Sequence, residues 1–158
     1  MTNSIPEIVK ADVIFINGSN TTAGHPVIGA QIRQAKKKGA KIIVVDPRVI
    51  DLTQDADVFL QILPGTNVAL YNGMMNVIIS EGLQNTAYIE ERTEKFEDLV
   101  AAVSAMTPEK AAEICSVSAE DIRTAARFYA QAEKGAIFYT MGVTQHTTGT
   151  EGVMSLSN

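Results

Sequence analysis

The chain has 158 residues, of which 46% are hydrophobic and 20% charged, a composition typical of a folded protein rather than a disordered one. The net charge of -5 disfavours a nucleic-acid partner, because phosphate backbones are bound by clustered Lys and Arg. The single cysteine, Cys115, excludes an internal disulfide and any zinc or iron–sulfur site built from cysteines of this chain. No apolar run approaches the roughly 20 residues of a membrane span and no secretion signal opens the chain, so we expect a cytoplasmic protein without membrane contact.

The first half of the chain alternates between apolar runs and helix-like stretches. Residues 12–17, 41–46 and 57–62 are short runs of β-branched and other apolar residues, which are typical of buried strands. Residues 26–38 have apolar side chains at helical spacing and begin with a proline, which favours the first turn of a helix. A second helix is predicted over residues 66–82, because this stretch follows Pro-Gly and closes at a glycine.

The second half is nearly all helical in pattern until a last strand. Within residues 86–134, helix starts are predicted at Thr107 and Ser118, where a capping residue precedes an apolar periodic stretch. Residues 136–142 (AIFYTMG) predict a fourth strand, and residues 143–150 predict a polar loop. Strands separated by helices favour parallel pairing through right-handed crossovers. We therefore predict one α/β domain over the whole chain, with a Rossmann-like, doubly wound, mainly parallel sheet and flanking helices in three layers.

Parallel α/β sheets bind ligands beyond the carboxyl ends of their strands. Four loops follow the predicted strands at that edge, and each is rich in Gly, Asn, Thr, Asp or Gln. These loops are residues 17–26, 46–48, 63–67 and 141–150. Their small hydrogen-bonding groups predict a site for a large, polar, phosphorylated ligand.

Two local features bear on the class of ligand. Gly18 and Gly24 do not have the G-x-G-x-x-G spacing of the nicotinamide-dinucleotide fingerprint. Asp46 ends the second strand, where a carboxylate can accept hydrogen bonds from a ribose or from guanine N–H groups. Asn20 and Asn67 also suit turns and helix caps, so each of them has a structural role as the alternative.

The loop motifs occur in one order: GSN followed by HP, then DPR, LPGTNVALYNGMMNVII and MGVTQHTTGT. In this order and at these intervals they resemble the molybdopterin-dependent oxidoreductases of the dimethyl-sulfoxide-reductase superfamily. Within that superfamily the chain is similar to the large (alpha) subunits of formate dehydrogenases, over essentially its whole length. The resemblance implies one cofactor-binding domain of a longer enzyme, in which bis-molybdopterin guanine dinucleotide carries molybdenum or tungsten and formate is oxidised to CO2.

The resemblance also implies which residues face this cofactor. The loops after the first three strands would hold the nucleotide and its pyrophosphate, and the last loop would lie nearer the pterin. Asn67 stands where many family members have Asp, which removes a charge but keeps an acceptor. The implied cofactor-binding residues are Gly18, Ser19, Asn20, Asp46, Pro47, Arg48, Gly65, Thr66, Asn67, Met141, Gly142, Gln145 and His146.

Several parts of the family's machinery have no counterpart among these residues. These are the cysteines for an iron–sulfur cluster, the selenocysteine or cysteine that binds the metal, and the catalytic histidine and arginine. Cys115, predicted in a helix far from the ligand edge, matches none of them, and we interpret it as a buried small residue. We therefore expect no catalytic residue or metal ligand here, and no formate oxidation by this chain alone. The implied partners are the other domains of the same polypeptide and electron-transfer subunits.

Two other classes of protein stay open on the residues alone. A stand-alone nicotinamide- or nucleotide-binding oxidoreductase would use Asp46 on the ribose and would need an acid–base group such as His25 or His146. We interpret His25 as a capping or packing residue because it precedes a helix-starting proline, whereas His146 lies in a ligand loop. A non-catalytic interaction domain would instead expose an apolar patch where its partner docks.

Overall fold

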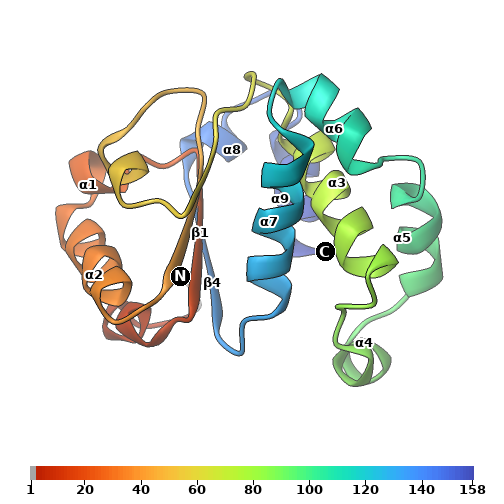
Figure 1. Ribbon diagram of the computed structural model, residues 1–158, viewed down its shortest axis with the longest axis horizontal. Coiled ribbons are helices and arrows are strands. Elements are labelled where there is room, and N and C mark those ends of the chain that lie inside the picture. The colour runs from red at the N-terminus through yellow and green to blue at the C-terminus, as the bar shows by residue number, and fades with distance from the viewer. Residues whose placement is uncertain (1–2) are drawn as a thin grey trace.

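The computed structural model describes residues 3–158, and four parallel strands in this range form one sheet (Figure 1). The order of the strands in the sheet is β3-β2-β1-β4, and every neighbouring pair is parallel. This arrangement confirms the predicted α/β class with a parallel sheet. The strands are β1 (Val13–Asn17), β2 (Lys41–Val45), β3 (Val58–Leu60) and β4 (Gly135–Tyr139).

Helices cover both faces of the sheet, which gives the three predicted layers (Figure 1). The 3-10 helix η1 and helix α2 lie on one face, and α3, α6 and α7 lie on the other. Of the helices in residues 3–158, none combines the length and the apolar character needed to cross a membrane. The helical segments are η1 (Ile5–Lys10), α1 (Thr21–Gly24), α2 (Pro26–Lys37), η2 (Asp51–Gln54), α3 (Asn67–Ser80), α4 (Thr86–Arg92), α5 (Phe96–Val103), α6 (Pro108–Cys115), α7 (Ala119–Ala130), α8 (Met141–Thr144) and α9 (Gly149–Ser157).

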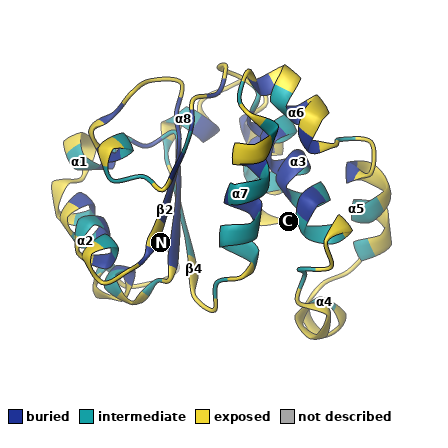
Figure 2. Ribbon diagram, in the orientation of Figure 1, coloured by how far each residue is buried: buried dark blue, intermediate teal, exposed yellow. Residues whose placement is uncertain are grey.

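The core is divided between the two faces by the alternation of side chains along β1. Ile14 and Ile16 pack with Ile32 of α2, whereas Phe15 packs with the α3 side, including Leu70. Because helices cover both faces, β1 is buried along its whole length, whereas the edge strand β4 is only partly buried, as the dark blue β2 and the teal β4 of Figure 2 show. This explains why β1 is a continuous apolar run in the sequence rather than an alternating one.

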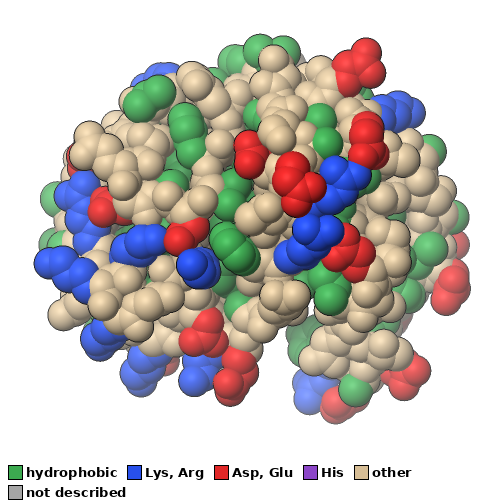
Figure 3. Space-filling view, in the orientation of Figure 1, with side chains coloured by type: hydrophobic (Ala, Val, Ile, Leu, Met, Phe, Trp, Pro, Cys, Tyr) green, Lys and Arg blue, Asp and Glu red, His purple; other side chains and the backbone are tan. Residues whose placement is uncertain are grey.

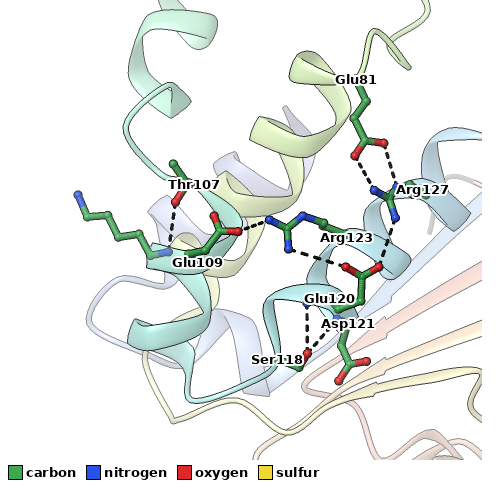
Figure 4. Close-up of polar contacts among 9 residues, drawn as sticks. Glu81, Thr107, Glu109, Ser118, Glu120, Asp121, Arg123 and Arg127 are labelled. Carbon is green, nitrogen blue, oxygen red and sulfur yellow. Dashed lines mark hydrogen bonds and ion pairs between the residues drawn. The ribbon is translucent and has the colours of Figure 1, made fainter.

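Two arginines of α7 pair with glutamates on the outer surface of the helical layer formed by α3, α6 and α7 (Figure 4). Arg127 makes two hydrogen bonds to Glu81, at 2.8 and 2.9 Å, just beyond the end of α3. Arg123 pairs with Glu109 of α6, and both arginines approach Glu120 of α7. The guanidinium of Arg127 lowers the pKa of the Glu81 carboxyl below its usual value, through the hydrogen bonds. These pairs are partly exposed, so they orient α7 more than they stabilise it.

The predicted strand over residues 136–142 is too long. β4 ends at Tyr139, and the next residues wind into the short helix α8. Thr140 turns the chain out of the sheet, because its Oγ1 donates a hydrogen bond to the carbonyl oxygen of Gly18 at 2.7 Å. The predicted loop over residues 143–150 therefore contains the end of α8 and the first residues of α9.

Candidate functional site

The carboxyl ends of the four strands lie at one edge of the sheet, at the top of Figure 1. Asn17 is in register with Val45 of β2 and with Tyr139 of β4, and Val45 is in register with Leu60 of β3. The strands therefore end at one level, and the loops after them emerge together, as predicted. In this strand order the winding reverses between β1 and β4, which is the place where parallel α/β sheets bind ligands.

The loops after β1 and β4 touch through two glycines. The N–H of Gly142 donates a hydrogen bond to the carbonyl oxygen of Gly18 at 3.1 Å. A Cβ atom on Gly18 would lie 2.6 Å from the Gly142 backbone, and the φ of Gly18 is +57°, in the left-handed region that favours glycine. Glycine is therefore required at Gly18 by both conformation and space, and the two loops meet at the point where the winding reverses.

The rest of the first loop folds on itself. Ser19 is buried, and its hydroxyl lies 3.0 Å from the hydroxyl of Thr21. Asn20 stands at the N-cap position of α1, and its Oδ1 accepts a weak hydrogen bond from the Thr22 hydroxyl at 3.4 Å. Of the two predicted ligand residues in this loop, Ser19 is buried and bonds within the turn, whereas Asn20 is half-buried and so partly reaches solvent.

His25 stands at the N-cap position of α2, where the sequence predicted a capping residue, but its side chain does not cap the helix. It is a single residue between the end of α1 and the start of α2, its side chain is exposed, and it makes no capping hydrogen bond. Its backbone joins the two helices, because its N–H donates to the carbonyl of Thr21 at 2.9 Å and its carbonyl accepts the N–H of Gly29 at 3.0 Å. The interpretation of His25 as a capping residue therefore holds for its position and backbone, whereas its exposed ring makes no capping hydrogen bond.

In the loop after β2, the buried carboxylate of Asp46 anchors the positively charged Arg48 at the edge. Asp46 is only 2% exposed, and its Oδ1 accepts the N–H of Arg48 at 2.9 Å and lies 3.5 Å from Arg48 Nε. The carbonyl of Pro47 accepts a hydrogen bond from Gln61 at 3.0 Å, which ties this loop to the one after β3. The Arg48 side chain is 71% exposed, so the group presented to solvent is a guanidinium rather than the Asp46 carboxylate.

The loop after β3 leads directly into α3. Gly65 has a φ of +87°, and a Cβ atom there would meet nothing within 4 Å, so its backbone borders open space. Thr66 is the N-cap residue, but its hydroxyl donates back to the carbonyl of Leu63 at 2.7 Å instead of capping the helix. The first N–H groups of α3 therefore have no side-chain cap and remain available at the edge.

Two polar residues of this edge, Asn17 and Tyr71, were not among the predicted cofactor-binding residues, although Asn17 begins the first predicted ligand loop. Asn17 is the last residue of β1, is 1% exposed, and donates hydrogen bonds from Nδ2 to the Asn67 Oδ1 at 3.1 Å and to the Tyr71 hydroxyl. The acceptor that Asn67 was expected to offer a ligand is thus used inside the protein. Burial raises the pKa of Tyr71 well above its ordinary value. The available signal was a polar residue that ends an otherwise apolar strand.

Cys115 is buried as predicted, but it is not far from the ligand edge. Its carbonyl accepts the N–H of Leu63 at 3.0 Å, and its Sγ lies 3.5 Å from the carbonyl of Thr66. The predicted location was wrong because α6 packs on α3, which brings the end of α6 against the loop after β3. Burial raises the pKa of the Cys115 thiol, so the group is an unreactive packing residue.

The predicted residues after β4 sit on and beyond α8. Met141 begins α8 and is 63% exposed. Gln145 follows the end of α8, and the ring of His146 folds back so that its Nε2 lies 3.0 Å from the carbonyl oxygen of Gly142. Gln145 and His146 are both exposed, and the contact of Gly142 with the first loop keeps them beside it.

The edge offers donors suited to an anion rather than ligands suited to a metal. Among residues 3–158, no three His, Cys, Asp or Glu side chains gather into a metal site. The donors are the Arg48 guanidinium, the N–H groups of the first turn of α3, and the Nδ2 of Asn67. No group in residues 3–158 accepts a hydrogen bond from this Nδ2. Val49 and Leu63 are exposed nearby, and Figure 3 shows hydrophobic side chains along this upper rim.

The sequence profile of the molybdopterin oxidoreductases matches residues 1–158. The chain belongs to this family. It is 51% identical over 158 residues to the F420-dependent formate dehydrogenase subunit alpha of Methanocaldococcus jannaschii, and 45% identical to formate dehydrogenase H of Escherichia coli. Both alignments cover the whole chain, but only 24% and 22% of the two relatives, so this molybdopterin oxidoreductase chain spans about a quarter of their length.

The solved structure of an enzyme with a different name, a hydratase, has the same fold. Acetylene hydratase from Pelobacter acetylenicus superposes with a TM-score of 0.88 at 26% sequence identity, over 96% of this chain and 22% of that one. The resemblance inferred from the loop motifs is thus confirmed at the level of the family, and the family implies a molybdopterin cofactor.

Proposed function

We propose that this chain is the domain of a formate dehydrogenase that binds the guanine dinucleotide arm of bis-molybdopterin guanine dinucleotide. The observation that carries the proposal is the meeting of the polar loops at the place where the winding of the sheet reverses, with Gly18 against Gly142. The identity of 51% and 45% to formate dehydrogenase alpha subunits supports formate as the substrate of the parent enzyme.

The donors at the edge fit a diphosphate. Arg48 supplies a positive charge, and the first turn of α3 supplies N–H groups and the positive end of a 14-residue helix. Gly65 leaves the backbone accessible beside them. We propose that these three features bind the pyrophosphate, while Asn20 and the loop that Asp46 anchors border the nucleoside and Met141, Gln145 and His146 border the pterin.

Nicotinamide dinucleotide fits this edge less well. In a nicotinamide-binding Rossmann domain, a free carboxylate after the second strand accepts the hydroxyls of the ribose. Here the Oδ1 of Asp46 is occupied by the backbone N–H of Arg48, and the carboxylate is 2% exposed. The loop after β1 also winds into α1 instead of forming the glycine-rich turn.

In the parent enzyme, formate would lose two electrons and one proton to give CO2. When bound, the molybdopterin cofactor would supply the molybdenum or tungsten centre that accepts the electrons. The residues of this chain would hold and orient that cofactor, while metal ligand, acid–base groups and iron–sulfur relay would come from other segments of the polypeptide and from electron-transfer subunits. This division is supported by the share of the two formate dehydrogenases that the chain covers, which is 24% and 22%.

Nucleotide titration tests the proposal. Guanosine diphosphate and NAD are added separately to the 15N-labelled chain, and the expected result is larger shifts at Asn20, Arg48 and Asn67 with guanosine diphosphate than with NAD, whose diphosphate can reach the same donors. Binding should be weak, because an open edge covers much less ligand than the roughly 70–90% covered by closed pockets. Tight NAD binding without a response to guanosine diphosphate would replace the proposal with a nicotinamide-binding domain.

Formate oxidation tests the assignment of the parent enzyme. The purified chain, reconstituted with metal and pterin cofactor, is assayed with a dye acceptor beside the full-length polypeptide that contains it. We expect turnover only in the full-length polypeptide. Activity in the 158-residue chain would contradict the proposed role as a cofactor-holding domain, and an inactive, cofactor-loaded full-length enzyme would contradict formate as the substrate.

A further inference from the structure

The polar group at the end of β1 is buried and has no role in the apolar core. Asn17 lies on the same face of β1 as Phe15, in a strand that is otherwise entirely apolar. Its Nδ2 uses two N–H groups, one to the Oδ1 of Asn67 and one to the hydroxyl of Tyr71. A buried amide costs free energy unless it is hydrogen-bonded, and Asn67 and Tyr71 supply the partners of this one.

The hydrogen bond from Asn17 sets which way the Asn67 amide faces. Because Asn17 donates, Asn67 must turn its oxygen toward β1, which leaves its Nδ2 on the other side. Asn67 is only 8% exposed, yet no group in residues 3–158 accepts a hydrogen bond from this Nδ2. It is also not among the fully buried atoms that lack a partner, so it reaches solvent at the start of α3.

Tyr71 in turn restrains Asn17. Its ring packs edge to face on Phe15 with the ring centres 6.3 Å apart, and Phe15 packs in the same way on Tyr129 at 6.4 Å. The hydroxyl is held in a buried position by this packing and by its place one helical turn after Asn67 on α3. The pair Asn17–Tyr71 is therefore a rigid support on which the Asn67 amide rests.

We propose that Asn17 and Tyr71 are positioning residues, which hold the amide of Asn67 with its N–H groups directed to an oxygen of the bound nucleotide. This inference rests on the proposed function, since it takes the phosphate-bearing ligand at the start of α3 as given. The pair converts Asn67 from a group that could face the ligand with either its oxygen or its nitrogen into a fixed hydrogen-bond donor. An anionic ligand oxygen accepts from such a donor and is repelled by the oxygen.

The substitution Asn17→Asp tests the orientation directly. A carboxylate at this position accepts instead of donating, so the Asn67 amide should rotate, give its N–H groups to the carboxylate and present its oxygen at the edge. Exchange of the Asn67 side-chain amide protons with solvent, measured by NMR, should be fast in the wild-type chain and slow in N17D. The affinity for guanosine diphosphate and for inorganic pyrophosphate should fall about tenfold, since a hydrogen bond to a charged group is lost.

Three further variants separate positioning from general destabilisation. Tyr71→Phe keeps the ring but removes the hydroxyl, and we expect a smaller loss of affinity with the Asn67 protons still exchanging fast. Asn17→Leu replaces the amide with an apolar side chain of similar size and tests the same site if N17D does not fold. Asn76→Leu is the matched control: this α3 amide donates to the carbonyls of Val103 and Ser104 at 3.1 and 3.3 Å, away from the edge.

The outcomes distinguish the two proposals. Slow exchange at Asn67 in N17D together with weaker binding in N17D than in N76L supports the positioning role. Equal exchange of Asn67 in wild type and N17D, or equal affinities of N17D and N76L, overturns it while leaving the proposed function intact. A wild-type chain that binds neither guanosine diphosphate nor pyrophosphate overturns the proposed function, and the positioning of Asn67 toward a nucleotide falls with it.

Discussion

The N–H of Gly142 donates a hydrogen bond to the carbonyl oxygen of Gly18, although 124 positions separate the two glycines in the sequence. The hydroxyl of Thr140 donates to the same carbonyl at 2.7 Å. These contacts join the loops that flank the place where the winding of the sheet reverses. The geometry of the ligand edge therefore depends on a close approach of two backbones, which side chains larger than hydrogen would prevent.

Replacing Gly142 with Ala should destabilise the chain by about 1–3 kcal/mol, because the added Cβ overlaps the Gly18 backbone and forces the loops apart. Urea unfolding measures the change. Gly24→Ala is the control, since a Cβ at that position meets nothing within 4 Å. Equal stabilities of the two variants would show that the glycine contact is not a constraint on the fold.

Tyr71 should make the stability of the chain fall in alkaline solution. Burial raises the pKa of Tyr71 in the folded state, so above the ordinary value of about 10 the unfolded chain releases a proton that the folded chain keeps. The stabilising effect is therefore complete below about pH 10 and is lost as the pH rises further.

Urea unfolding between about pH 8 and 11 checks this dependence on pH. Tyr71→Phe should reduce the alkaline slope, and the slope that is left should come in part from Tyr129, whose pKa burial also raises. A slope that is identical in wild type and Y71F would contradict the prediction.

The Arg127–Glu81 pair should contribute a salt-sensitive part of the stability. Arg127→Gln removes both hydrogen bonds to Glu81 and the longer one to Glu120, all shown in Figure 4, so the unfolding midpoint should drop at low ionic strength. The drop should shrink at about 1 M salt, where the Debye length is about 3 Å. Arg92→Gln, which affects only a pair with the adjacent Glu91 on the exposed α4, should change the midpoint at neither salt concentration.

Cys115 should not react with a thiol reagent in the folded chain. Its side chain is completely buried, and burial raises the pKa of the thiol, so the reactive thiolate is scarce and inaccessible. Absorbance after addition of a disulfide reagent should remain flat in buffer and rise to one thiol per chain in denaturant. Rapid labelling under native conditions would show that α6 opens away from the loop after β3.

The order of strands and helices could be predicted because it depends on local patterns. Continuous apolar runs identified β1 and β2, and Pro26 correctly marked the first residue of α2. The place of the ligand loops followed from a general rule, since parallel strands separated by helices must direct their carboxyl ends to one edge.

Only the tertiary structure decided which groups at that edge face outward. The sequence presents Asn67 and Asp46 as polar residues at loop ends, but their acceptors are occupied by Asn17 and by the Arg48 backbone. The position of Cys115 was also decided by tertiary structure, because the packing of α6 on α3 brings this residue to the edge. The distance and orientation between the residues in each of these contacts depend on how helices pack on the sheet. An asparagine or a cysteine has the same local preferences whether its partner is another side chain or a ligand, so the sequence alone does not distinguish the two cases.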